Sequence, residues 1–144
     1  MTAPTISVLM AVYNGEQYLN AAIESILNQT FTNFEFIIIN DGSTDLSWNI
    51  INKYAAKDKR IVPITQNNIG LTKSLNKGIK MARGEYIARQ DADDQSLRSR
   101  FEVQLDIAKK NKCKIIYSKA YINQINKKHI QPLDKWINNI NNDV

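Results

Sequence analysis

The sequence has few of the residues that build disulfides and soft-ligand metal centres. It contains a single cysteine, Cys113, and a single histidine, His129. Cys113 has no partner for an internal disulfide and no Cys or His neighbour at metal-ligand spacing, so we expect a packed thiol in a reduced, cytosolic protein. His129 follows Lys127 and Lys128 in an expected turn, where a surface role is expected.

Glycine-rich phosphate motifs and long apolar runs are also absent. The turn after the first expected strand has only Gly15, and no Gly-Lys-Ser/Thr sequence occurs, so phosphate binding must rely on a metal ion. No apolar run approaches the length of a membrane span, and the N-terminus lacks the basic region of a signal peptide. Aromatic residues make up 8% and form no base-stacking array, which argues against nucleic-acid binding.

The net charge of +5 is concentrated toward the C-terminus. Residues 109–144 carry eight lysines against two acidic residues, whereas the preceding residues are almost balanced. A solvated lysine face is one interpretation, and peripheral contact with an anionic membrane surface or a phosphate-bearing partner is the other. With 144 residues, 43% of them hydrophobic, the chain can form one domain with a sizeable core.

Apolar runs and helical stripes alternate along the chain and predict an α/β fold. The central expectation is an open, mostly parallel, Rossmann-like sheet with helices on both faces. Pro63 indicates an edge or irregular strand, Gly84 a helix C-cap, and one of Ser43, Thr44 and Asp45 a helix N-cap. The expected strands cover residues 6–12, 34–39, 60–65 and 85–88, and the helical stripes cover 19–27, 46–55, 71–82 and 101–108.

Further elements are expected after residue 111. These are a strand over 114–122, a short partner at 129–131 and an amphipathic helix over 133–140. We expect a single domain over residues 1–144, with 132–144 as a peripheral C-terminal helix or a frayed tail.

An acidic stretch follows the fourth expected strand. Asp91, Asp93 and Asp94 place three carboxylates within four residues. Such crowding is tolerated on a solvated, helix-capping turn or where Mg²⁺ or Mn²⁺ neutralises it. In an open α/β sheet, ligands bind beyond the carboxyl ends of the strands, which places this stretch on one rim with Asp41. That convergence favours the metal interpretation.

Four motifs in order give the sequence a specific resemblance. Val8–Asn14, Asn40-Asp-Gly-Ser-Thr-Asp45, Asn68-Ile-Gly-Leu71 with Asn76, and Gly84-Glu-Tyr-Ile87 followed by Asp91-Ala-Asp-Asp94 resemble family 2 glycosyltransferases over residues 5–125. The resemblance implies a GT-A fold that binds a nucleoside diphosphate sugar, usually UDP-linked, with Mn²⁺ or Mg²⁺. It also implies inverting transfer to a saccharide or lipid-linked acceptor, often in polysaccharide synthesis at the inner membrane face.

The resemblance also assigns residues to a site. Asp41 matches the carboxylate that reads the base, and Asp91-Ala92-Asp93 matches the Asp-x-Asp signature. The implied metal ligands are Asp91, Asp93 and Asp94. The implied nucleotide-sugar contacts are Ala11, Val12, Tyr13, Asn14, Glu16, Asp41, Asn68, Gly70, Lys73, Asp91, Ala92 and Asp93.

The chain departs from the family pattern in three places. Ala11 and Arg98 stand where many members have proline. No motif for the catalytic base or the acceptor half is found, and Asp134 is interpreted as an acid at a helix N-terminus. We therefore expect a donor domain truncated before the acceptor half. The alternatives are a non-catalytic nucleotide-sugar-binding module and, ranked last, a phosphate- or nucleic-acid-binding domain.

Overall fold

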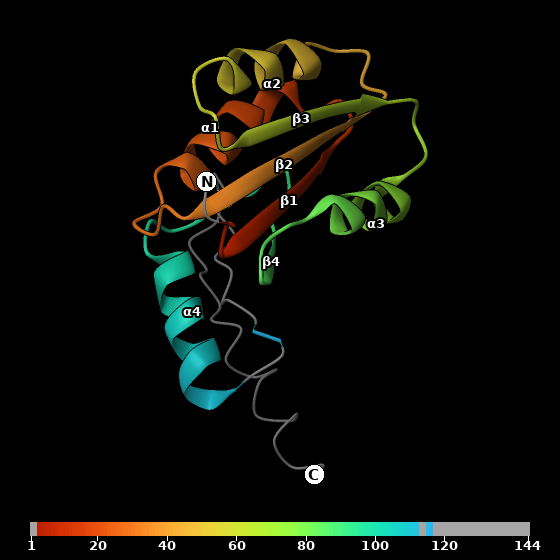
Figure 1. Cartoon of the computed structure of the whole chain (residues 1–144). Coiled ribbons are helices and arrows are strands. Elements are labelled where there is room, and N and C mark those ends of the chain that lie inside the picture. The colour runs from red at the N-terminus through yellow and green to blue at the C-terminus, as the bar shows by residue number, and fades with distance from the viewer. Residues whose placement is uncertain (1–2, 113–114, 117–144) are drawn as a thin grey trace, which may run out of the picture. The chain divides into compact units, whose positions relative to one another are not determined.

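The computed structural model describes residues 3–112 and 115–116 (Figure 1). The chain divides into two compact units, Met1–Val103 and Gln104–Val144. Of the strand expected over 114–122, only residues 115–116 are described, and they belong to no regular element. Cys113, His129, and the elements expected at 129–131, 133–140 and 132–144 lie outside the described residues. The single-domain expectation stays a prediction.

Four parallel strands form the sheet of the first unit. They are β1 (Ile6–Val12), β2 (Phe34–Asp41), β3 (Ile61–Gln66) and β4 (Tyr86–Arg89), in the order β3-β2-β1-β4. The two central strands are the most apolar, because both of their faces are covered by other parts of the fold. Pro63 lies in β3 at one edge of this sheet, as its missing N–H predicts.

Helices cover both faces of the sheet. Figure 1 shows α1 (Glu16–Leu27) and α2 (Ser47–Ala55) on one face and α3 (Leu71–Met81) on the other. Under α3, Leu9, Ile37 and Ile39 form a buried cluster from alternate positions of β1 and β2. The last described helix, α4, spans Arg100–Asn111. The α/β prediction, with helices on both faces of a parallel sheet, is confirmed.

Gly84 does not have the role that the sequence predicted. Helix α3 ends at Met81, and its C-cap residue is Ala82 in an extended conformation, so Gly84 is not the helix C-cap. Gly84 instead passes directly over β1, where an added Cβ would lie 2.5 Å from the Ser7 backbone nitrogen. The position therefore requires glycine for close backbone approach, a need that arises from tertiary structure.

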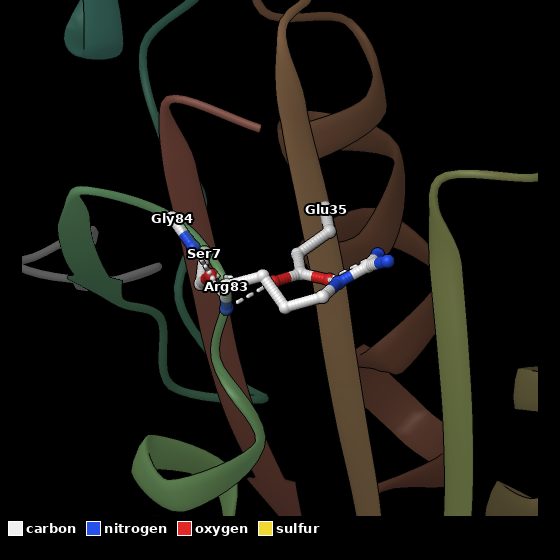
Figure 2. A network of polar contacts seen from close by, with 4 residues as sticks. All are labelled: Ser7, Glu35, Arg83 and Gly84. Atoms are coloured by element: carbon white, nitrogen blue, oxygen red, sulfur yellow. Dashed lines mark hydrogen bonds and ion pairs between the residues drawn. The ribbon is translucent and has the colours of Figure 1, made fainter. Parts of the chain in front are cut away.

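A buried polar network explains that close approach (Figure 2). Ser7 Oγ accepts the Gly84 N–H at 2.8 Å and donates to Glu35 Oε1 at 2.6 Å. The Arg83 guanidinium donates to Glu35 Oε2 through Nε at 2.9 Å and Nη2 at 2.6 Å. The network fixes the connection between α3 and β4 onto the amino ends of β1 and β2.

Glu35 is the charged centre of this network. Burial alone would raise the pKa of Glu35, but hydrogen bonds from Ser7 and Arg83 and the charge of Arg83 outweigh it and lower that pKa. A carboxylate with a lowered folded-state pKa contributes stability above its unfolded pKa. That contribution is lost as the pH falls through the folded-state value.

We predict that Glu35→Gln lowers the free energy of unfolding at pH 7 by about 1–3 kcal/mol, because it leaves buried donors without a charged acceptor. The difference from wild type should shrink below pH 4.5, the ordinary pKa of this group. Urea unfolding at pH 7 and pH 4 measures both. Asp106→Asn, in the exposed pair with Lys110, is the control and should leave the unfolding curve unchanged. A pH-independent difference would contradict the prediction.

Candidate functional site

The loops that leave β1 and β2 are joined by an exchange of hydrogen bonds. Asn14 N–H donates to Ser43 Oγ at 3.0 Å, and Asn14 Oδ1 accepts the Thr44 N–H at 2.8 Å. Glu16 N–H donates to Asp45 Oδ2 at 3.0 Å, and Glu16 Oε2 accepts the Leu46 N–H at 2.8 Å. Asp45, in the β2 loop, therefore caps the start of α1, and Glu16, the first residue of α1, caps the start of α2. We call this arrangement the crossed caps.

The crossed caps correct the expected helix start and explain the missing glycine motif. Helix α2 begins at Ser47 with Leu46 as N-cap, and Asp45 caps it by accepting the Ser47 N–H at 2.9 Å. Ser43 and Thr44, the other expected caps, bond to Asn14 instead. Because carboxylates already lie at the starts of α1 and α2, a phosphate at either helix terminus would meet negative charge.

Asp41 joins the loop after β3 to the end of β2. Its side chain is 3% exposed. Oδ1 accepts from Gln66 Nε2 at 2.8 Å and from the Ile69 N–H at 3.0 Å, and Oδ2 accepts the Gly70 N–H at 2.9 Å. Burial alone would raise the pKa of Asp41, but these hydrogen bonds outweigh it and lower that pKa. Asp41 is therefore an ionised anchor for this loop.

Two further contacts fix the same loop. Gly42 has a φ of +76°, and an added Cβ there would lie 2.6 Å from the Asn68 backbone nitrogen, so the loops after β2 and β3 touch. Gln66 also donates to Ser74 Oγ and accepts from Lys77 Nζ, both at 2.8 Å. Gln66 is a site residue that the sequence interpretation missed, and its position as the last residue of a strand was the available signal.

The acidic turn after β4 is held from beneath by a buried glutamine. Gln90 is 3% exposed, and its Nε2 donates to the carbonyls of Asp91 at 3.1 Å and Asp94 at 2.9 Å. Its Oε1 accepts from Ser96 Oγ at 2.7 Å and from Arg100 Nη1 at 3.0 Å. These bonds close the turn into a defined shape. Gln90 was also missed, although it directly follows the last residue of β4.

The carboxylates of the turn differ in their surroundings. Asp91 forms two hydrogen bonds with the Arg89 guanidinium, at 3.0 and 3.1 Å. Asp93 is exposed, and its side chain makes no hydrogen bond or ion pair with residues 3–112. Partial burial, together with repulsion from Asp93 and Asp91, raises the pKa of Asp94. The turn is therefore an electronegative patch, and a bound cation would reduce the repulsion among its carboxylates.

The fit of this turn to a divalent ion rests on its donor chemistry. Among the described residues, no three His, Cys, Asp or Glu side chains are already placed to hold a metal ion together. Carboxylate oxygens suit Mg²⁺ and Mn²⁺, and Mg²⁺ commonly takes one or two carboxylates and completes its shell with substrate phosphates and water. Asp91, Asp93 and Asp94 fit that kind of site better than a cage made by protein alone.

The four loops form one continuous rim. The acidic turn lies beside the β1 loop, since a Cβ built on Gly15 would come within 3.6 Å of Ala92 Cβ. The β1 loop joins the β2 loop through the crossed caps, and Asp41 joins β2 to the β3 loop. The sheet order places β2 and β4 on either side of β1, so the loops that carry Asp41 and Asp93 flank the β1 loop.

The other expected contact residues also lie on or beside this rim. Val12 is 1% exposed and therefore lies beneath the surface of the rim, whereas Tyr13 is 56% exposed. Ala11 is partly buried in β1, and Asn68, Gly70 and Lys73 are exposed around the start of α3.

Within the part of the chain that the structure describes, no helix has the length and apolar character needed to cross a membrane.

Comparison with known proteins identifies the class of protein that this fold and rim define. The family model for glycosyl transferase family 2 matches residues 7–143, and the chain belongs to that family. The putative glycosyltransferase EpsH of Bacillus subtilis (strain 168) is 51% identical over 94 residues, 65% of this chain and 27% of EpsH. The uncharacterized glycosyltransferase MJ1057 of Methanocaldococcus jannaschii is 45% identical over 115 residues, 78% of this chain and 40% of its own length.

Solved structures share the fold. S. aureus TarS 1–349 in complex with UDP has a TM-score of 0.68 at 27% identity, covering 74% of this chain and 32% of that one. The TarS complex with UDP-GlcNAc gives a TM-score of 0.69. The GT-A fold implied by the resemblance is confirmed. This chain spans roughly a third of the length of EpsH, MJ1057 and TarS 1–349.

The crossed caps predict a measurable contribution to folding. Asp45→Ala removes acceptors for two backbone N–H groups, and a lost helix cap typically costs about 0.5–2 kcal/mol. We expect a lower urea midpoint for Asp45→Ala, and an intermediate one for Asp45→Asn, which keeps one oxygen. Asp106→Ala is the control for loss of an exposed carboxylate. A midpoint for Asp45→Ala equal to that of the control would contradict the crossed-cap role.

Proposed function

We propose that this chain is the donor-binding domain of an inverting, metal-dependent glycosyltransferase that uses a UDP-linked sugar. The observation that carries the proposal is the continuous rim, on which Asp41 and the acidic turn flank one loop. The TarS complexes with UDP and UDP-GlcNAc, at 27% identity, support a uridine donor. PcManGT, whose likeness at 20% identity concerns the fold alone, is described in complex with GDP-Man and Mn²⁺.

In this proposal Asp41 reads the base. A carboxylate oxygen can accept two hydrogen bonds, so Oδ2, which takes the Gly70 N–H, can also take the imide N–H of uracil. Because the pKa of Asp41 is lowered, the group is ionised at neutral pH and remains an acceptor. Ala11, Val12, Tyr13, Asn14 and Asn68 lie around the nucleoside, and Glu16 acts behind them by capping α2.

The diphosphate is assigned to the acidic turn and the start of α3. Asp91, Asp93 and Asp94 would hold Mn²⁺ or Mg²⁺, while Gly70 and Lys73 face the phosphates from the other side. Bound there, a divalent ion supplies Lewis acidity that stabilises the departing diphosphate. In the complete reaction an acceptor hydroxyl, from a saccharide or a lipid-linked saccharide, would attack C1 of the sugar as the bond from C1 to the diphosphate oxygen breaks. A carboxylate base, which is not among the residues assigned to this site, would take the hydroxyl proton.

The charges of the rim favour a second candidate, a nucleotide-sugar-binding module that does not itself catalyse transfer. Glu16, Asp41 and Asp45 all accept backbone N–H groups, and the pKa values of Asp41 and Asp45 are lowered despite burial. A general base works best with a pKa near the operating pH, so neither aspartate suits that role. This candidate predicts UDP binding without turnover.

The proposed setting is the cytoplasm, with the lysine-rich residues 109–144 in contact with the inner membrane face during polysaccharide synthesis. Binding to vesicles with and without anionic lipid tests this part separately from donor binding.

Donor binding is tested by calorimetric titration of UDP with and without Mn²⁺. We expect Mn²⁺-dependent affinity that falls at least tenfold in Asp93→Ala, because this exposed side chain has a role in the ligand complex and none in the described fold. Asp106→Ala, an exposed carboxylate in α4, is the matched control and should bind as wild type does. Metal-independent affinity, or equal affinity in Asp93→Ala, would refute the proposal.

A pair of buried glutamines tests whether the shape of the acidic turn matters for binding. Gln29 is 4% exposed and bonds to the carbonyls of Ser25 and Leu97, but not to the acidic turn. We expect Gln90→Leu and Gln29→Leu to lower the melting temperature comparably. Gln90→Leu alone should weaken Mn²⁺-dependent UDP binding, measured well below either melting temperature. Equal loss of affinity in both variants would contradict a specific role for Gln90.

A further inference from the structure

The backbone of the acidic turn is set before any ligand arrives. Gln90 bonds to the carbonyls of Asp91 and Asp94, and Arg100 Nη2 donates to the Arg89 carbonyl at 2.9 Å. Arg100 Nη1 also donates to Ser96 Oγ at 2.8 Å. The guanidinium of Arg100 thus donates hydrogen bonds to residues on both sides of the turn. Ligand binding can therefore proceed through side-chain movements on a fixed backbone.

Arg89 is held much less firmly than Arg100. Its ion pair with Asp91 has an N···O distance of 2.9 Å, with side-chain exposures of 56% for Arg89 and 42% for Asp91. In the pair formed by Arg83 and Glu35, by contrast, the carboxylate is 5% exposed. Exposed ion pairs are weak because water and salt screen them. A competing cation can therefore replace the Arg89 pair at low cost.

Arg89 also occupies both oxygens of Asp91. Nε donates to Oδ1 at 3.0 Å and Nη2 donates to Oδ2 at 3.1 Å. A metal ion coordinated by Asp91 must displace at least one of these bonds, since both cations approach the same lone pairs. The guanidinium would then be free to move, because no other bond of its side-chain nitrogens is present in the described structure.

We propose that Arg89 is the exchangeable counter-ion of the acidic turn, which holds Asp91 while the turn is empty and releases it when a divalent cation binds. The inference rests on the proposed function, which places the cation at this turn. It explains how the turn can stay compact with three neighbouring carboxylates. It also assigns Arg89 as a positioning residue that lowers the affinity for free metal ion until the donor brings its own phosphate ligands.

The test compares Mn²⁺ affinity in the 144-residue chain, measured by the electron paramagnetic resonance signal of free Mn²⁺ without nucleotide. Arg89→Gln should bind Mn²⁺ about two- to fivefold more tightly than wild type, the range that an exposed ion pair can supply. Arg98→Gln is the matched control, because Arg98 is exposed in the same segment and its side chain makes no ion pair with the described residues. The Arg98→Gln variant corrects for the loss of one positive charge, and it should change the Mn²⁺ affinity by less than Arg89→Gln does.

A second measurement follows the guanidinium directly. In wild type, the Arg89 Nε–H resonance, assigned by its loss in Arg89→Gln, should shift when diamagnetic Mg²⁺ is added, and the Arg100 Nε–H resonance should not. The proposal that a cation displaces Arg89 would be overturned if Arg89→Gln bound Mn²⁺ no more tightly than Arg98→Gln. It would also be overturned if the Arg89 signal did not shift at saturating Mg²⁺. If UDP still binds with Mn²⁺ in that case, the proposed function stands and the displacement of Arg89 is refuted. If wild type binds neither Mn²⁺ nor UDP, both are wrong.

Discussion

The crossed caps, in which Glu16 and Asp45 cap each other's helices, are the constraint on which the rim depends. Glu16 and Asp45 each satisfy a backbone donor at the start of the helix that follows the other loop. Neither helix start can therefore adopt its conformation independently of the other. The loop after β3 is bonded to this pair through Asp41, and the loop after β4 lies beside it, where Ala92 is near Gly15.

The two ends of the sheet use the same physical means for different purposes. At the amino end, Ser7, Glu35 and Arg83 form a closed network. Their polar groups bond to one another and hold the chain in place. At the carboxyl end, the buried carboxylate of Asp41 and the buried amide of Gln90 hold loops whose outer side chains remain available. A ligand-binding rim needs this separation, because its loops must be rigid where they meet the sheet and accessible where they meet a ligand.

Sequence patterns predicted the elements well where burial is continuous. The strand expected at residues 6–12 has the bounds of β1, because a continuous apolar run followed by turn residues is typical of a strand buried on both faces. Gly84 was misinterpreted because its constraint comes from Ser7, far away in the chain. Gln66 and Gln90 were missed for the same reason. Their partners become neighbours only when parallel strands end at one edge, and no local periodicity encodes those contacts.

Topology indicated which loops would carry the candidate site, whereas the roles that the resemblance gives to its residues stay predictions. Asp41 and Asp93 were placed on one rim from topology, and the sheet order agrees with that placement. The sequence could not indicate that Asp41 and Glu16 also hold backbone groups of neighbouring loops. A motif residue can therefore be retained for the shape of the loop as well as for contact with the ligand.

The short side chain of Ala92 has a consequence for the spacing of the rim. It lies between Asp91 and Asp93 in the chain, and only a Cβ built on Gly15 would come within van der Waals distance of it, at 3.6 Å. Glycine at position 15 and alanine at position 92 together leave room between the acidic turn and the β1 loop. A valine or leucine at the centre of the triplet would fill that room and push the acidic turn away from the β1 loop, while leaving every charge unchanged.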